Sequence, residues 1–152
     1  RKTRPKLETP FKCYIYCTLK PDDVNNLLEI HGEDGKIRRA NGKVIGEFVC
    51  DKMYGIYYSI YPHDPPVFEE IGTLNRPNVM AETCLSEIEL NDYLDGETGY
   101  GWHISALQIY DKPMELSEFH KPEMPTGLRH EDDTIKRPPR SWAYVEGYDG
   151  KR

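Results

Sequence analysis

Residues 37–50, IRRANGKVIGEFVC, carry the clearest turn signal in the chain. Asn41 and Gly42 supply the positive φ angles that a tight two-residue turn requires, and strand-forming residues lie on either side of them. The stretch therefore predicts a β-hairpin. Its second strand continues through residue 60 and contains Gly46 and Gly55. Glycines inside such a run mark the bulges or bends that small closed barrels need.

Three other stretches predict strands. Residues 11–18, FKCYIYCT, alternate between two faces as a β-strand does. Residues 100–113, YGWHISALQIYDKP, carry apolar side chains on both faces, which predicts a strand in the middle of a sheet. Residues 137–147, RPPRSWAYVEG, predict a proline-fixed approach to a short final strand.

Helical signals are short and few. Residues 85–96, LSEIELNDYLDG, begin with a capping box formed by Ser86 and Glu89 and end near a glycine. Residues 21–32, PDDVNNLLEIHG, predict a second short helix, and the Pro- and Asn-rich residues 61–80 predict a loop or insertion. Many short, bent strands with little helix favour an α+β fold, in the form of a small β-barrel with one or two short helices.

Length and composition suit a single globular domain over residues 1–152. The hydrophobic fraction of 38% and the charged fraction of 30% are typical of a soluble protein. No apolar run approaches the roughly 20 residues of a membrane span. The four cysteines are too few for a disulfide scaffold, and no C-x-x-C pair indicates zinc. We expect Cys13 and Cys17, which share one face of a predicted strand, to be small buried hydrophobic residues in a reducing cytoplasm.

Charge is unevenly distributed along the chain. The net charge is −6, from 20 cationic and 26 anionic residues, so the chain is not a general polycation. Cations nevertheless gather in residues 1–12, 36–43 and 136–140, whereas acids gather in residues 82–97. If the three basic clusters meet in space, they form a patch that attracts anions. If they do not meet, they are solvated turns, and the sequence leaves both interpretations open.

The motifs of several site classes are missing from the sequence. The five histidines show no H-x-x-x-H spacing, so no metal site is expected. The chain contains neither G-x-x-x-x-G-K-[ST] nor G-x-G-x-x-G, which excludes the classical mononucleotide and dinucleotide loops. His103 and Ser105 share a predicted strand face, but no G-x-S-x-G elbow surrounds them. A hydrogen-bonded pair is favoured over a catalytic dyad, and His103 keeps the capacity to act as an acid or base.

The remaining candidates are aromatic and basic residues of the kind that bind nucleic acids. Tyr100 and Trp102 lie on one face of a predicted strand, and aromatic rings can stack nucleobases. Cations hold phosphates and set the register of a bound strand. The competing interpretation is that these rings are ordinary core residues.

Three blocks of sequence together resemble a known family. They are NGKVIGEFVCD at residues 41–51, GWHISALQIYDKPMELSEF at residues 101–119, and RPPRSWAYVE at residues 137–146. In this order they resemble the ASCH (activating signal cointegrator homology) domains of bacteria and phages, which are similar to the PUA, YTH and EVE domains. The resemblance covers most of the chain and is weakest over residues 61–80. It implies a small PUA-like β-barrel that recognises RNA or a modified nucleotide.

The resemblance also bears on the first residues of the chain. The family signature is G-x-K-x-x-E-x-R, and Arg1 resembles its terminal arginine, which implies a domain without its first strand and helix. In hydrolytic relatives the catalytic Lys and Thr lie inside that signature, so they have no counterpart here. Glu89 and Glu97 are the candidates for the third catalytic group. The resemblance therefore supports binding more firmly than catalysis, and whether the protein is an enzyme stays open.

We expect an RNA- or nucleotide-binding module whose first residues pass near the strand that contains Trp102. The cations engage phosphate, Tyr100 or Trp102 stacks a base, and His103 and Ser105 read its edge. RNA or a nucleotide is the expected partner, and neither a cofactor, a metal nor a membrane is expected. The predicted site residues are Arg1, Lys2, Arg4, Lys6, Tyr100, Trp102, His103, Ser105, Arg137 and Arg140.

Two alternatives accompany this hypothesis. The first is a small hydrolase, acting on acetylated cytidine or as a ribonuclease in a longer form of the chain, as the resemblance implies. The second is a protein-interaction adaptor of phage or mobile-element origin that uses the acidic helix at residues 85–96 as its contact face.

Overall fold

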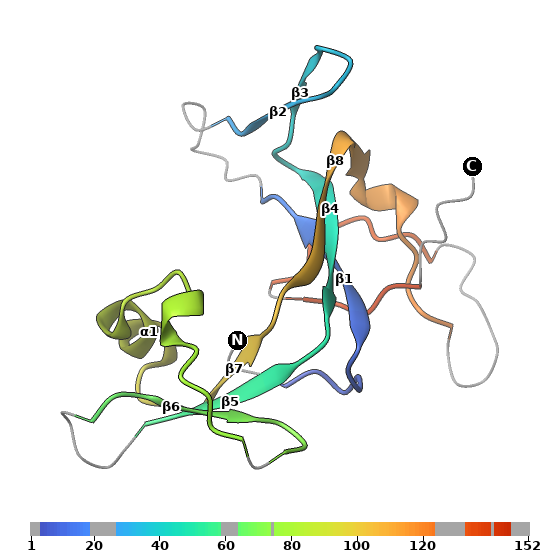
Figure 1. Cartoon of the computed structure of the whole chain (residues 1–152). Helices are drawn as coiled ribbons and strands as arrows, with labels where there is room; N and C mark the ends of the chain where they lie inside the picture. The colour runs from blue at the N-terminus through green and yellow to red at the C-terminus, as the bar shows by residue number, and fades with distance from the viewer. Residues whose placement is uncertain are drawn as a thin grey trace. The chain divides into compact units, whose positions relative to one another are not determined.

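The computed structural model describes residues 4–18, 27–58, 64–73, 75–123, 133–140 and 142–146. These residues form mainly strands and one α-helix, so the fold class is α+β, as predicted. In chain order the elements are β1 (Phe11–Tyr16), β2 (Glu29–His31), β3 (Ile37–Arg39), β4 (Lys43–Cys50), β5 (Met53–Tyr57), β6 (Val67–Glu70), the 3-10 turn η1 (Met80–Glu82), α1 (Glu87–Leu94), β7 (Gly99–Trp102), β8 (Ser105–Glu115) and the 3-10 turn η2 (Leu116–Glu118) (Figure 1).

The strands belong to three sheets. Their orders are β1-β4-β8, β2-β3 and β6-β5-β7. The pairs β2/β3, β5/β6 and β5/β7 are antiparallel. Across the described strands none of these sheets closes on itself, so the small barrel stays a prediction.

The chain forms two compact units. The first, which we call the helical unit, consists of Arg1–Phe11 and Val49–Ala106 and contains α1. The second, which we call the hairpin unit, consists of Lys12–Phe48 and Leu107–Arg152 and contains the β2-β3 hairpin. Each unit has its own buried hydrophobic cluster.

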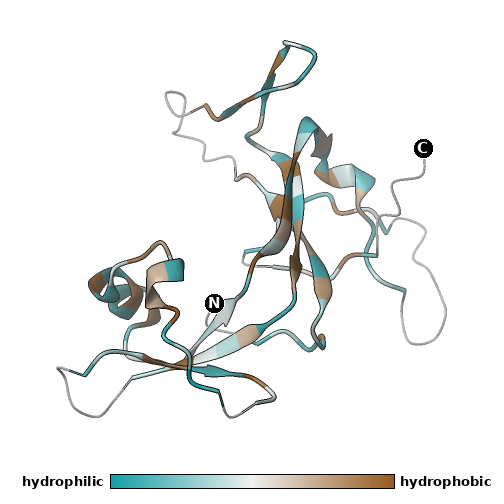
Figure 2. Cartoon of the chain, viewed as in Figure 1, coloured by the Kyte–Doolittle hydropathy of each residue, from teal (hydrophilic) through white to brown (hydrophobic). Residues whose placement is uncertain are grey.

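The core of the helical unit lies between α1 and one face of the β6-β5-β7 sheet (Figure 1). Leu90 and Leu94 are four residues apart and share one face of α1, and both are buried, whereas Ile88 is 74% exposed. Figure 2 shows that hydrophobic and hydrophilic residues alternate along α1. The buried members of the core are Tyr54, Ile56, Phe68, Val79, Leu90 and Leu94.

The predicted cap of α1 is confirmed. The Ser86 hydroxyl accepts a hydrogen bond from the Glu89 backbone N–H, and the Glu89 carboxylate accepts one from the Ser86 backbone N–H. These bonds satisfy donors that would otherwise be unpaired at the helix start. The helix ends at Asp95, which adopts the left-handed conformation with a φ of 54°.

The hairpin unit is built around the buried side chains of Val44, Phe119 and Ile135. Partly buried hydrophobic residues pack against them, namely Tyr14, Tyr16, Tyr110, Met114, Leu116 and Val145. The Lys12 ammonium donates to Glu47 at 2.8 Å, and the Tyr110 hydroxyl donates to the other oxygen of Glu47 at 2.6 Å. Because Lys12, Glu47 and Tyr110 lie on β1, β4 and β8, this network links all three strands of the sheet.

The hairpin expected over residues 37–50 is only partly correct. A turn forms here, with a hydrogen bond from the Lys43 N–H to the Ala40 carbonyl, but only Gly42 has a positive φ, of 81°, so the positive φ predicted for Asn41 is wrong. The strands on its two sides do not pair with each other, because β3 pairs with β2, and β4 lies between β1 and β8. Turn chemistry is local, whereas the partner of each strand is chosen by tertiary packing.

Other secondary-structure predictions also need correction. The helix expected at residues 21–32 is wrong at its end, because Glu29–His31 is the strand β2, while residues 21–26 lie outside the described chain. Residues 61–80, expected as a loop or insertion, contain the strand β6. The final strand expected after residue 140 is absent from residues 142–146.

The strand expected at residues 100–113 is two strands. It breaks at His103 and Ile104, so that β7 and β8 belong to different sheets. Each pairs with a single described strand, so neither is central. Apolar residues on both faces predicted a central strand, but Leu107 and Ile109 of β8 are exposed.

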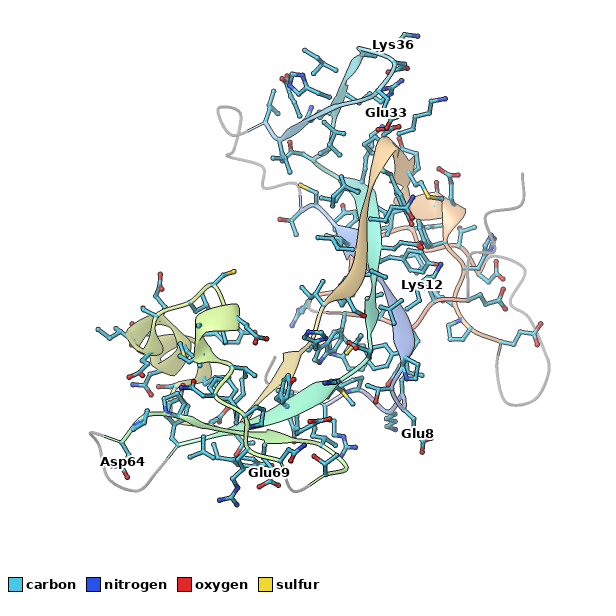
Figure 3. The ribbon with its side chains drawn as sticks, viewed as in Figure 1. Glu8, Lys12, Glu33, Lys36, Asp64 and Glu69 are labelled. Carbon is cyan, nitrogen blue, oxygen red and sulfur yellow. The ribbon has the colours of Figure 1, made fainter. Side chains whose placement is uncertain are left out.

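The β2-β3 hairpin carries an ion pair that predicts how Asp34 titrates. Figure 3 shows Lys36 at the outer end of this hairpin. The Arg38 guanidinium donates to both carboxylate oxygens of Asp34, at 2.8 and 2.5 Å. These hydrogen bonds lower the pKa of Asp34 to about 2. The pKa of Asp34 is lower in the folded state than in the unfolded state. The Asp34–Arg38 ion pair therefore stabilises the folded state fully above pH ~4, and this stabilisation is lost as the pH falls through 2.

A pH titration of the Asp34 carboxyl carbon by NMR checks this prediction. We expect Arg38→Gln to raise the Asp34 pKa towards 3.8, the value without partners. Arg39→Gln removes the same charge from the next position of β3, where side chains alternate in direction, and should leave the pKa near 2. An equal rise in both variants would contradict the assignment of the shift to Arg38.

Candidate nucleic-acid interface

The face of the β5/β7 ladder opposite the core carries aromatic side chains. Trp102 pairs with Met53 and Tyr100 pairs with Gly55, and directly opposed residues share a face. Tyr57 is two residues beyond Gly55 and therefore lies on the same face, where its ring covers Gly55: a Cβ on Gly55 would be 2.5 Å from the Tyr57 hydroxyl. The core residues Tyr54 and Ile56 occupy the other face.

The N-terminal segment reaches this aromatic face through Phe11. The Phe11 and Trp102 rings pack edge to face, with centroids 5.6 Å apart and an interplanar angle of 85°. Before Phe11, Pro5 is buried and its two neighbours Arg4 and Lys6 are exposed. Because each residue extends the chain by at most about 3.6 Å, the Cα of Lys6 lies within roughly 18 Å of the Phe11 Cα. The helical unit therefore contains both exposed cations and the aromatic face.

Directly after Trp102, His103 is held by a carboxylate. Its Nδ1 lies 2.6 Å from Oδ1 of Asp51, and the two side chains are 35% and 37% exposed. The His103 backbone N–H donates to the Lys52 carbonyl, which closes the β5/β7 ladder beside this pair. The hydrogen bond from His103 lowers the pKa of the Asp51 carboxyl, so Asp51 is ionised near neutral pH.

Ser105 and Cys50 do not complete a nucleophilic site with this histidine. The Ser105 hydroxyl donates to the Val49 carbonyl at 2.9 Å, whereas a serine nucleophile needs a hydrogen bond to the ring nitrogen remote from the aspartate. Burial raises the pKa of the Cys50 thiol to about 11, so it remains protonated and inert. The arrangement suits binding through the ring of His103 better than covalent catalysis.

One acidic group also lies on the aromatic face. Glu69 pairs with Gly55 across β5/β6, and Figure 3 shows it on the side of β6 away from α1. Arg76 donates two hydrogen bonds to one carboxylate oxygen of Glu69, at 3.2 and 3.1 Å. This ion pair reduces the repulsion that an isolated carboxylate would exert on a bound phosphate.

The ten predicted site residues fall into three groups. Arg1 and Lys2 lie outside the described residues. Arg137 and Arg140 are exposed in the hairpin unit. The helical unit contains the other six, namely Arg4, Lys6, Tyr100, Trp102, His103 and Ser105.

Sequence reasoning missed three residues of this site: Asp51, Tyr57 and Phe11. Asp51 lies inside the strand predicted up to residue 60, which in the structure breaks between β4 and β5, and it has no local feature that links it to His103. Only the pairing of β5 with β7 brings the two together. The register also shows that Tyr57 shares the face of Tyr100. For Phe11, the alternation of residues 11–18 indicated a strand but not a contact with Trp102.

The hairpin unit contains a second histidine–aspartate pair. Nδ1 of His120 lies 2.7 Å from Oδ1 of Asp133, and the Glu146 N–H donates to the His120 carbonyl. Nearby in the sequence, Trp142 and Tyr144 pack edge to face with centroids 4.9 Å apart. Because this unit also contains Arg137, experiments must distinguish the two units.

The helical unit also has a cavity of about 410 Å³. Its lining is mainly apolar, with Arg76 and Glu87 as the charged members. The lining residues are Pro65, Pro66, Val67, Phe68, Arg76, Pro77, Asn78, Met80 and Glu87. None of the predicted site residues lines it.

The described part of the chain contains neither a metal-binding cluster nor a membrane-spanning helix. No group of three or more His, Cys, Asp or Glu side chains there could hold a metal ion. Over the same residues, no helix has the length and apolar character needed to cross a membrane.

Comparisons with known proteins give no neighbour. No family model matches the chain, and neither a curated protein nor a solved structure matches it. The function must therefore be argued from the chain's own residues and geometry.

Proposed function

We propose that the chain is an RNA- or nucleotide-binding module of the ASCH and PUA-like type, and that it binds single-stranded RNA on the aromatic face of the helical unit. One observation carries the proposal: the Phe11–Trp102 contact, which joins a segment with exposed cations to β7, the strand that contains Tyr100 and Trp102 and is followed directly by His103.

Each group has a defined part in this proposal. Arg4 and Lys6 contact phosphate, which supplies affinity that depends on salt. Tyr57, which is exposed, and Tyr100 and Trp102, which are half-buried, stack bases, and His103 supplies a polar contact to a base edge. Arg137 and Arg140 lie in the hairpin unit and have no part in this proposal. The Ser105 hydroxyl donates its proton to the Val49 carbonyl, so it makes no donor contact to a base. Recognition of a modified base is one form of this function.

The adaptor hypothesis has one supporting observation. Leu85, Ile88 and Tyr93 are exposed on or beside α1, although Leu90 is buried. Nothing on this surface indicates the chemistry of a partner, so RNA binding remains the conclusion. The hydrolase hypothesis for a longer chain stays a prediction.

A salt series tests the proposed function. Binding of a fluorescently labelled single-stranded RNA is measured by anisotropy between 50 and 300 mM salt, values chosen to span roughly the range over which phosphate contacts are lost. We expect the affinity to fall as salt rises. In the double variant Arg4→Ala/Lys6→Ala, the slope of log K against log salt should shrink by about 1.4, which is about 0.7 for each lost phosphate contact.

A matched double variant controls for net charge. Lys36→Ala/Lys112→Ala removes two exposed cations from the hairpin unit and should leave the slope unchanged. Affinity that is undetectable at the lowest salt, or that does not respond to salt, contradicts the proposal. An equal loss of slope in both double variants contradicts the placement of the phosphate contacts in the N-terminal segment.

A further inference from the structure

The Asp51–His103 pair decides which nitrogen of the histidine ring carries the proton. Asp51 is ionised near neutral pH, and an ionised carboxylate only accepts hydrogen bonds. At 2.6 Å, Nδ1 of His103 must therefore be the donor. In the uncharged ring the proton lies on Nδ1, so Nε2 carries a lone pair and acts as an acceptor.

The position of His103 makes this acceptor available to a ligand. Nε2 is on the opposite side of the ring from Nδ1 and so points away from Asp51. No described residue forms a hydrogen bond with it, and the side chain is 35% exposed. The ring directly follows Trp102, the aromatic residue that contacts Phe11. An acceptor whose position is fixed by a hydrogen bond on the other side of its ring can distinguish bases by the donors on their edges.

We propose that His103, with its tautomer set by Asp51, selects bases that carry an exocyclic amino group, namely adenine and cytosine. This inference rests on the proposed function and adds a specificity to the same site. Adenine presents its N6 amino group and cytosine its N4 amino group as donors. Uracil and hypoxanthine present a carbonyl oxygen at the same positions, and that oxygen would face the Nε2 lone pair. In this scheme His103 is the specificity-determining residue and Asp51 is a positioning residue.

Matched oligonucleotides test the selection. At pH 8, above the range in which a histidine gains charge, affinities are compared for oligocytidine against oligouridine and for an adenine-containing strand against its hypoxanthine counterpart. We expect the amino-bearing strand to bind about five- to tenfold more tightly in each comparison, as one well-placed hydrogen bond would give. Equal affinities within both comparisons would overturn the inference. If none of the four oligonucleotides binds, the result would instead contradict the proposed function itself.

Two variants test whether Asp51 and His103 determine the base preference without disrupting the fold. Asp51→Asn keeps the shape of the side chain, but its amide can present either a donor or an acceptor to Nδ1, so both tautomers become accessible. In this variant we expect the ratio of affinities within each oligonucleotide pair to fall to about one, while the affinity keeps its dependence on salt. His103→Phe keeps an aromatic ring and should lose the preference to the same extent. A preference that survives either substitution contradicts the assignment.

The tautomer can also be observed in the free protein. Long-range ¹H–¹⁵N correlation spectra at pH 8 should show the His103 proton on Nδ1 in the unsubstituted chain and a mixture of tautomers in Asp51→Asn. A proton on Nε2 in the unsubstituted chain would contradict the inference, and this test needs no RNA.

Discussion

Trp102→Ala is expected to weaken binding of single-stranded RNA by roughly 5- to 150-fold, the range that corresponds to the loss of one stacked base. Trp102 lies on the face of the β5/β7 ladder opposite the core, next to Tyr100 and in edge-to-face contact with Phe11. Removing the half-buried indole deletes one of the proposed stacking surfaces and also the edge-to-face contact with Phe11. Trp102→Phe should recover most of the affinity, because a smaller aromatic face remains.

The control for this variant is Trp142→Ala. Trp142 lies in the hairpin unit, and the chain has two tryptophans, so the two substitutions delete the same side chain from different units. Trp142→Ala should bind RNA as the unsubstituted chain does. If Trp142→Ala loses affinity and Trp102→Ala does not, the interface lies in the hairpin unit, beside the His120–Asp133 pair. Melting curves of both variants check that the fold is retained.

The variant Trp142→Phe provides an independent measurement. It leaves Trp102 as the sole tryptophan, so its fluorescence reports on the proposed interface alone. RNA should quench this fluorescence with the same concentration dependence as the anisotropy change. An unchanged emission at saturating RNA would contradict stacking on Trp102.

Leu94→Ala is expected to lower the free energy of unfolding of the helical unit by about 2–5 kcal/mol. Leu94 is fully buried on α1 and belongs to the core with Leu90 and Phe68. The Gly99 backbone lies directly against it, because a Cβ built on Gly99 would be 2.5 Å from a Leu94 methyl carbon. Truncation to alanine would therefore open a cavity between α1 and β7.

Ile88→Ala is the matched control, since it removes a similar aliphatic side chain from an exposed position of the same helix. Its cost should stay within about 0.5 kcal/mol. Denaturant titrations followed by Trp102 fluorescence in the Trp142→Phe background measure both values at a common slope. A smaller loss for Leu94→Ala than for Ile88→Ala would mean that α1 does not cover the sheet as described.

Local structure was predictable wherever the signal lay in neighbouring residues. The capping box of α1 formed as expected, because its hydrogen bonds join residues three apart in the sequence. The positive φ of Gly42 was predictable for the same reason, although Asn41 does not share it and the turn is therefore not of the predicted type.

Strand partners were not predictable in the same way. The sequence of residues 37–50 predicted a turn, but it gave no information on whether β3 would pair with β4 or with β2. The break between β7 and β8 at His103 likewise has no marker in a run that alternates throughout. Pairing depends on residues distant in the sequence, which compete for the same edges.

The candidate site likewise combines features that the sequence predicted with contacts that only the tertiary structure shows. From the sequence alone came the residue types, namely the cations at residues 4 and 6, the rings of Tyr100 and Trp102, and His103 beside them, because their chemistry is inherent in each side chain. Only the tertiary structure decided that Phe11 packs on Trp102 and that Asp51 lies against His103. The physical reason is that a contact between side chains about fifty residues or more apart in the sequence is set by strand register and packing, and neither is a property of a local pattern.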